Sequence, residues 1–187
     1  GTCFADIGNQ VYCVDKDKNK IDKLNSGISP IYEPGLDELI KKNYNANRLI
    51  FTTDIKKAIN SSDLIFICVG TPTKKGSLKV DLSFVYKCSK EILKHTKKKK
   101  IIITKSTVPV GTGDEIEKII KKKKKLFSVI SNPEFLREGE AIRDFRYPDR
   151  IVIGSDNKNE FKTMRKLYSP LISKGAKFFT TSRKGAE

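Results

Sequence analysis

Short apolar runs alternate with amphipathic stretches along most of the chain. The apolar runs are rich in Ile, Val and Phe and do not alternate with polar residues, which is typical of parallel strands covered on both faces. They predict strands at 11–15, 49–53, 64–69, 101–104, 127–130, 151–153 and 177–181. The amphipathic stretches predict helices at 18–26, 36–43, 55–60, 82–95, 113–124 and 160–171. Because strands and helices alternate, we expect an α/β fold with βαβ units and a doubly wound, mostly parallel sheet.

The composition adds a strong positive charge to this picture. The formal net charge is +16, and Lys97–Lys100 and Lys121–Lys125 carry much of it. One possible function class is therefore a non-catalytic nucleotide-binding module whose basic face meets nucleic acid. However, both tracts fall at the ends of predicted helices, where cations complement the helix dipole, and no aromatic residues interleave with them. We therefore favour a solvated Lys-rich face and expect no nucleic-acid partner.

Length and special residues exclude further classes. A chain of 187 residues can bury one full hydrophobic core, and no run approaches the roughly 18 to 20 apolar residues that span a bilayer. Without a signal-peptide pattern, we expect a cytoplasmic protein with no membrane partner. The 4 cysteines form no C-x-x-C pair and the chain has 1 His, so no metal site is expected. Cys13 and Cys68 lie in apolar runs and are expected to be buried, reduced thiols.

Asp15 ends the first predicted strand and begins the pattern D-x-D-x-x-K, which Lys20 completes. An acid at this place in a dinucleotide-binding fold accepts hydrogen bonds from the adenosine ribose and, by repelling a 2′-phosphate, favours NAD over NADP. An ordinary acid at a strand-to-helix turn explains the residue equally well. The G-x-G-x-x-G loop that would decide between them does not occur in the chain. Because residues 1–15 predict the end of a helix followed by a strand, we expect the first strand and this loop to lie upstream.

Two loops follow neighbouring apolar strands and carry hydroxyl groups. Val69-Gly70-Thr71-Pro72-Thr73 offers a Gly that lets a ligand approach the backbone, although a simple turn has the same composition. The loop from Lys105 to Thr112 (K-S-T-V-P-V-G-T) precedes a predicted helix. Its hydroxyls suit a phosphate, a carboxylate or a positioned water, or the loop is a capping segment with Thr112 as the N-cap. Both interpretations stay open for each loop.

The segment Asn132–Gly139 (N-P-E-F-L-R-E-G) predicts a helix start, with Asn132 as N-cap and Pro133 at the first helical position. On such a helix Glu134 and Glu138 share one face. A pair of acids near a ligand crevice can supply a general base or position a water. A solvated acidic helix face is the other interpretation of the pair.

These segments, in this order, resemble the UDP-glucose/GDP-mannose dehydrogenase family. The resemblance rests on Gly27–Leu36 (G-I-S-P-I-Y-E-P-G-L), Phe51–Asp54 (F-T-T-D), Val69–Pro72, Lys105–Thr112, Ser131–Gly139 and Pro148–Gly154 (P-D-R-I-V-I-G). Any one of them is weak, but six in register make chance agreement very improbable. The sequences S-T-V-P-V-G-T and P-D-R-I-V-I-G are most similar to those of the UDP-glucose branch of the family.

The resemblance implies an NAD-binding domain over 1–187 with a Rossmann-type sheet that lacks its first strand and Gly-rich loop. It also implies oxidation of UDP-glucose to UDP-glucuronate with two NAD and one water. The adenosine ribose would be held by Asp15 and Lys20. NAD would contact Val69, Gly70, Thr71, Pro72, Thr73, Ser106, Thr107 and Glu138. The nucleotide-sugar site would be lined by Glu134, Phe135, Leu136, Arg137 and Glu138. Thr107 would help to position the water, Glu134 would act as acid/base in a thioester step, and Glu138 would lie near the nicotinamide.

The chain departs from the family pattern in what it omits. The family's nucleophilic Cys stands in a G-x-x-G-S-C-F-P-K-D motif that does not occur here, and neither do its long central helix and UDP-binding domain. We therefore expect residues 1–187 alone to be inactive and the intact enzyme to be a homo-oligomer. GDP-mannose and UDP-N-acetylmannosamine 6-dehydrogenases are the alternatives within the family.

Overall fold

The computed structural model describes residues 1–74, 76–77 and 79–187. The chain divides into two compact units, each formed by two stretches of sequence. The first unit comprises Gly1–Ser62 and Phe135–Asp149, and the second comprises Asp63–Glu134 and Arg150–Glu187.

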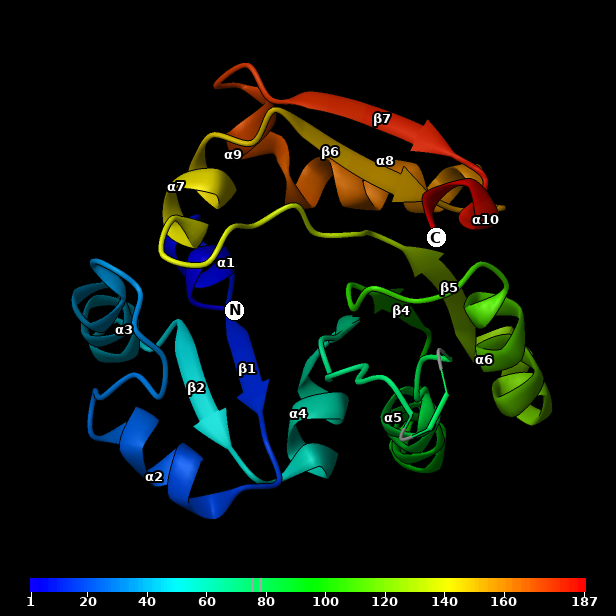
Figure 1. The fold of residues 1–187 in the computed structure, drawn as a ribbon, viewed down its shortest axis with the longest axis horizontal. Helices are drawn as coiled ribbons and strands as arrows, with labels where there is room; N and C mark the ends of the chain where they lie inside the picture. Colours follow the sequence, from blue (N-terminus) through cyan, green and yellow to red (C-terminus); the bar gives the residue numbers. More distant parts are fainter. Residues whose placement is uncertain (75, 78) are drawn as a thin grey trace. The chain divides into compact units, whose positions relative to one another are not determined.

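The first unit is built on a two-stranded parallel sheet (Figure 1). Strand β1 (Val11–Val14) pairs with β2 (Leu49–Thr52) so that Val11 lies opposite Leu49. The helices of this unit are α1 (Thr2–Asp6), α2 (Lys18–Asn25), α3 (Leu36–Asn45), α4 (Ile55–Ser61) and α7 (Ala141–Arg146). Asp17 caps α2 by accepting a hydrogen bond from the Lys20 amide, and Asp54 caps α4 in the same way. The apolar faces of these elements meet in one core formed by Ala5, Ile21, Ile40, Leu49 and Phe51.

The second unit contains a five-stranded sheet with the order β3-β4-β5-β6-β7. Its strands are β3 (Leu64–Ile67), β4 (Lys100–Thr104), β5 (Phe127–Ser131), β6 (Arg150–Gly154) and β7 (Lys177–Thr181). Its helices are α5 (Ser83–His95), α6 (Thr112–Ile120), the 3-10 helix η1 (Lys121–Leu126), α8 (Lys158–Leu167), α9 (Ser169–Ile172) and α10 (Arg183–Ala186). All neighbouring strands are parallel except β5 and β6. The predicted α/β class and mostly parallel sheet are therefore confirmed.

Buried isoleucines explain why the apolar runs became central strands. Ile102 and Ile103 in β4, Ile130 in β5 and Ile153 in β6 are completely buried. Removing such side chains from water on both faces of a sheet stabilises it by about 25 cal/mol for each Å² of apolar surface. Ile116 on α6 is equally buried, which fixes the face that this helix turns toward the core.

Several predicted helices end earlier or later than expected. The predicted helix 113–124 is α-helical only to Ile120 and continues as η1, in which Lys123 has a non-helical φ of −125°. That turn directs the Lys123 ammonium to the carbonyl oxygens of Leu93 and Thr96, at 3.1 Å each, where it caps the end of α5. The predicted helix 160–171 is divided at Tyr168 because Pro170 cannot donate to a continued helix.

The predicted helix at Asn132–Gly139 was wrong. Residues 132–137 have no regular secondary structure, and the next helix, α7, begins at Ala141. Asn132 is buried and does not cap a helix: its amide nitrogen atom Nδ2 donates to Val152, and its side-chain oxygen accepts from Tyr168. Its backbone N–H donates to Thr104 and so extends the β4–β5 pairing. Glu134 and Glu138 therefore do not share a helix face.

Two smaller expectations also need correction. Gly111, with a φ of +94°, is the N-cap of α6 in place of Thr112, whose hydroxyl donates backward to the Pro109 carbonyl at 2.6 Å. This left-handed conformation suits Gly because it has no Cβ. Cys68 is exposed, whereas Cys13 is partly buried against the core of the first unit. Among the described helices, none is long and apolar enough to cross a membrane.

Candidate functional site

The carboxyl ends of β3 and β4 carry the two hydroxyl-bearing loops, and hydrogen bonds join these loops. The Thr71 hydroxyl donates to the Thr107 carbonyl at 3.0 Å. The Ser106 hydroxyl donates to the Val69 carbonyl at 2.7 Å. The backbone N–H groups of Lys105 and Ser106 both donate to Ile67, the last residue of β3. Because β3 and β4 are parallel neighbours, their loops leave the sheet at one edge, and these bonds hold them together there.

Thr107 and Gly70 are the accessible members of this edge. Thr107 is exposed, its carbonyl is occupied by Thr71, and its hydroxyl has no hydrogen-bond partner among the described residues. Gly70 is exposed, and no described atom lies within 4 Å of the position that a Cβ would take. The edge therefore offers a hydroxyl and open backbone to a ligand. Of the predicted contacts, Val69, Thr71, Ser106 and Thr107 are brought together, while Pro72 and Thr73 are exposed next to them.

Glu134 lies at the same edge because β5 is the next parallel strand after β4. The hydrogen bond from Asn132 to Thr104 continues that pairing for one residue, and Pro133 and Glu134 follow without regular secondary structure. The side chain of Glu134 is exposed. Asn132 is anchored from the interior by Tyr168, whose hydroxyl donates at 2.6 Å. Glu134 stays a predicted site residue, and what anchors the backbone next to it is the buried amide of Asn132 and not a helix.

Lys105 is a charged residue of this edge to which the sequence gave no role. Its side chain is half-buried, and burial lowers the pKa of its ammonium group below the ordinary 10.5, while the nearby Glu134 carboxylate opposes that shift. Lys105 thus places a cation close to the Glu134 carboxylate. Its position just before Ser106 and Thr107 was visible in the sequence, but its burial was not.

Asp15 and Lys20 form an ion pair at the carboxyl end of β1 in the first unit. The Lys20 ammonium donates to Asp15 Oδ2 at 2.6 Å, and the backbone N–H of Asp17 donates to Asp15 Oδ1 at 3.1 Å. The hydrogen bond from Lys20 lowers the pKa of the Asp15 carboxyl, although partial burial opposes the shift. Asp15 is therefore a carboxylate at neutral pH. A carboxylate at a strand tip can accept hydrogen bonds from vicinal hydroxyls, which is the fit that an adenosine ribose requires.

Residues 135–138 belong to the first unit, where they precede α7. Phe135 and Leu136 are exposed, at 47% and 38%. The Arg137 guanidinium is bound by Asp144 through two hydrogen bonds of 3.0 and 2.7 Å and by Glu140 at 2.6 Å. These bonds hold the segment against α7. Glu138 is exposed in the turn that follows.

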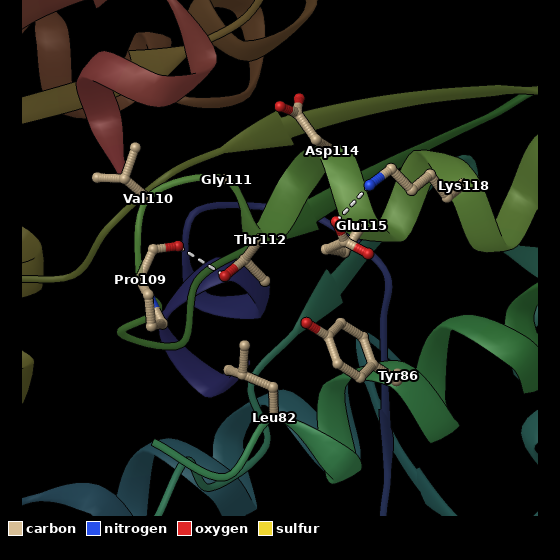
Figure 2. Close-up of a pocket in the computed structure, with 9 residues that line it drawn as sticks. All are labelled: Leu82, Tyr86, Pro109, Val110, Gly111, Thr112, Asp114, Glu115 and Lys118. Atoms are coloured by element: carbon tan, nitrogen blue, oxygen red, sulfur yellow. Dashed lines mark hydrogen bonds and ion pairs between the residues drawn. The ribbon is translucent and has the colours of Figure 1, made fainter. Parts of the chain in front are cut away.

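A pocket of about 360 Å³ lies beside the loop that carries Thr107. Figure 2 shows its lining of Leu82, Tyr86, Pro109, Val110, Gly111, Thr112, Asp114, Glu115 and Lys118. The charged side chains on its rim have partners, since Glu115 pairs with Lys118 at 2.6 Å and Asp114 pairs with Arg183. Burial raises the pKa of the Tyr86 hydroxyl. We assign no ligand to this pocket.

The comparison with protein families decides what kind of site this is. Residues 1–172 match the model described as the UDP-glucose/GDP-mannose dehydrogenase family, NAD binding domain. The chain therefore belongs to the UDP-glucose/GDP-mannose dehydrogenase family. Its Rossmann-type fold and its NAD cofactor follow from that membership. Within the first unit, the strand-tip carboxylate of Asp15 suits the ribose of such a cofactor.

Individual relatives agree with the family assignment. A protein of Rhizobium meliloti named UDP-glucose 6-dehydrogenase is 50% identical over 98% of this chain and 43% of its own length. The structure of a ternary complex of GDP-mannose dehydrogenase from Pseudomonas aeruginosa superposes with a TM-score of 0.92 at 35% identity, over 99% of this chain and 44% of that one. A UDP-glucose dehydrogenase from Pyrobaculum islandicum gives 0.91 at 32% identity, over 99% and 43%. The chain thus spans less than half the length of these relatives.

Proposed function

We propose that residues 1–187 are the NAD-binding part of an enzyme that oxidises UDP-glucose to UDP-glucuronate. The observation that carries this proposal is the 50% identity with the Rhizobium meliloti UDP-glucose 6-dehydrogenase. The reaction takes four electrons from the primary alcohol of the sugar as two hydrides, which pass to two NAD, and adds the oxygen of one water. The nucleophilic Cys and the UDP-binding domain are proposed to come from sequence other than residues 1–187.

In this proposal the first unit binds the adenosine end of NAD. Asp15 accepts hydrogen bonds from the ribose hydroxyls, and Lys20 holds the carboxylate in place through its 2.6 Å ion pair. A carboxylate repels a 2′-phosphate, so NAD is favoured over NADP. Bound NAD supplies the hydride acceptor. The loop from Val69 to Thr73 offers it open backbone at Gly70.

The second unit contributes the groups that act on the substrate. The Thr107 hydroxyl, which has no partner among the described residues, is free to orient a water. Glu134 would take a proton from that water as it attacks the thioester formed with the enzyme's Cys; the C–S bond then breaks, and the released thiolate recovers the proton from Glu134. The cation of Lys105 stabilises the Glu134 carboxylate beforehand. Lys105 also stabilises negative charge that develops on the attacked oxygen.

Residues 135–138 are proposed to line the nucleotide-sugar site. The exposed apolar side chains of Phe135 and Leu136 suit the faces of a base or a sugar ring. Glu138, which is also exposed, would lie near the nicotinamide. Arg137 is proposed to act mainly by fixing this segment, because Asp144 and Glu140 already occupy its guanidinium.

The test is a turnover assay on a protein that contains residues 1–187 together with the remaining length found in the relatives. We expect two NADH for each UDP-glucose consumed, and little turnover with NADP. GDP-mannose is the second candidate substrate, since the Pseudomonas aeruginosa GDP-mannose dehydrogenase superposes with a TM-score of 0.92. A higher kcat/KM with GDP-mannose or with UDP-N-acetylmannosamine would contradict UDP-glucose as the substrate. Residues 1–187 alone are expected to produce no NADH.

A further inference from the structure

Helix α10 brings a buried arginine against α6 and β5. The Arg183 side chain is 5% exposed, and its guanidinium donates to Glu117 at 2.7 Å and to Asp114 on the exposed side of α6. It also donates to the carbonyl of Val129 in β5 at 3.3 Å. Asp156 adds a third carboxylate at 3.6 Å. Three carboxylates thus surround the cation, which fastens the start of α6 to the sheet, while its buried Nε has no hydrogen-bond partner among the described residues.

Glu187 completes this attachment at the first residues of α6. Its Oε2 accepts from the backbone N–H of Gly111 at 2.6 Å, and its Oε1 accepts from the backbone N–H of Gly113 at 2.7 Å. The first N–H groups of a helix have no partner within the helix, and the dipole there favours a negative charge. A single carboxylate thus satisfies two N–H groups that no side chain of the loop itself reaches.

Two glycines leave the space that this contact needs. A Cβ on Gly113 would stand 2.5 Å from Cδ of Arg183 and 2.8 Å from Oε1 of Glu187. A Cβ on Gly154 would stand 2.4 Å from the Cβ of Ala186 and 2.8 Å from the carbonyl oxygen of Ser182. A larger residue at Gly154 would displace the backbone of α10, and one at Gly113 would displace the side chains of Arg183 and Glu187 that make the contact.

The attachment holds one end of the loop from Lys105 to Thr112, and the sheet edge holds the other. At the sheet edge Ser106 bonds to Val69 and Thr71 bonds to Thr107. At the helix end Gly111 and Gly113 are bound by Glu187. Between these points, the backbone N–H and the hydroxyl of Thr112 both donate to the Pro109 carbonyl, at 3.2 and 2.6 Å. The position of Thr107 therefore depends on both ends.

We propose that Arg183 and Glu187 are positioning residues for Thr107 in the oxidation reaction. They act through the α6 N-terminus and touch neither substrate nor cofactor. The inference rests on the proposed function, because it assigns them to the loop that carries the water-orienting hydroxyl. It adds Arg183 in α10 and Glu187 directly after this helix, two residues to which no sequence motif gave a role.

The experiment compares Glu187→Gln with Glu115→Gln in the full-length protein. Both variants remove one negative charge near the start of α6, but Glu115 pairs with Lys118 and accepts from no backbone N–H in the part of the chain that the structure describes. We expect Glu187→Gln to lower kcat about 10-fold with less than a twofold change in KM for NAD, and Glu115→Gln to change neither. Arg183→Lys keeps the charge but loses the forked geometry, and it should also lower kcat.

A double-mutant cycle separates positioning from general loss of stability. If Glu187 acts through Thr107, Glu187→Gln should lower kcat less than twofold once Thr107→Ala has removed the hydroxyl. An equal loss in both backgrounds, or no loss in the single variant, would overturn the proposal.

Amide hydrogen exchange gives a readout that does not depend on turnover. Exchange at Gly111 and Gly113 should accelerate at least 10-fold in Glu187→Gln and stay unchanged in Glu115→Gln. Unchanged exchange in Glu187→Gln would refute the attachment itself. If exchange accelerates but the unsubstituted protein oxidises no nucleotide sugar, the attachment stands and the proposed function fails.

Discussion

The hydroxyl of Tyr168 donates a 2.6 Å hydrogen bond to the side-chain oxygen of Asn132 inside the second unit. Both residues are buried, at 3% and 2% exposure. This bond reaches from the end of α8 to the residue that precedes Pro133 and Glu134. It therefore connects the packing of a distant helix to the carboxylate proposed as acid/base.

Tyr168→Phe is predicted to destabilise the protein and to slow catalysis together. Removal of the donor leaves the Asn132 oxygen buried without that partner, which costs about 1–3 kcal/mol in the free energy of unfolding. Urea unfolding measures this loss, and kcat reports the displacement of Glu134. Tyr32→Phe is the control, because Tyr32 is 90% exposed. Equal unfolding midpoints for the two variants would show that the buried bond contributes nothing.

Gly154→Ala is predicted to lower stability, and Gly70→Ala is predicted to weaken NAD binding without lowering stability. A Cβ at Gly154 would meet Ala186 at 2.4 Å, so we expect a loss of about 1–3 kcal/mol from overpacking. A Cβ at Gly70 meets no described atom within 4 Å, so stability should hold while the KM for NAD rises. Thermal unfolding and NAD titration of both variants check the pair. A Gly70→Ala variant with unchanged KM would argue against cofactor contact at that backbone.

The ion pair of Arg137 with Asp144 predicts one component of acid unfolding. Hydrogen bonds from Arg137 lower the pKa of Asp144 from 3.8 to about 2. Because the folded pKa is the lower one, this stabilisation is present above pH 3.8 and is lost as the pH falls toward 2. Urea midpoints between pH 5 and pH 2 should therefore fall less steeply in Asp144→Asn than in the unsubstituted protein. Parallel curves would contradict the prediction.

Lys105 predicts an alkaline limit to activity. Burial lowers the pKa of its ammonium below 10.5, so the cation beside Glu134 is lost at a lower pH than for an exposed lysine. We expect kcat to fall on the alkaline side with an apparent pKa below 10.5, and this limb to move to higher pH in Lys105→Arg. Lys94→Arg, on α5, is the control and should leave the profile unchanged. If the alkaline fall of kcat stays at the same pH in Lys105→Arg, the titrating group is not Lys105.

The strands could be predicted from the sequence because their cause is local. Runs such as Ile101–Thr104 have apolar side chains at consecutive positions. A strand that is covered on both faces of its sheet requires only such a run, so it can be recognised from the local sequence. The candidate residues Thr71, Thr107 and Glu134 were found for a related reason. Parallel strands leave a sheet at one edge, so polar residues directly after them are brought together.

What the sequence could not predict depends on partners far along the chain. Asn132 has the local signature of a helix cap, but bonds to Val152 and Tyr168, 20 and 36 residues away, set its conformation instead. The same holds for Glu187, whose partners at Gly111 and Gly113 are 76 and 74 residues away. Periodicity and capping rules contain no information at such separations.

The five lysines from Lys121 to Lys125 are equivalent in the sequence, but Lys123 has a structural role of its own. Its ammonium closes the end of α5 through Leu93 and Thr96. Acetylation there would remove the charge and leave one N–H for the two carbonyls, whereas acetylation of the exposed Lys121 or Lys122 would remove only a solvated charge. The same modification would therefore fray the end of α5 when it falls on position 123 and leave that helix end intact when it falls on Lys121 or Lys122.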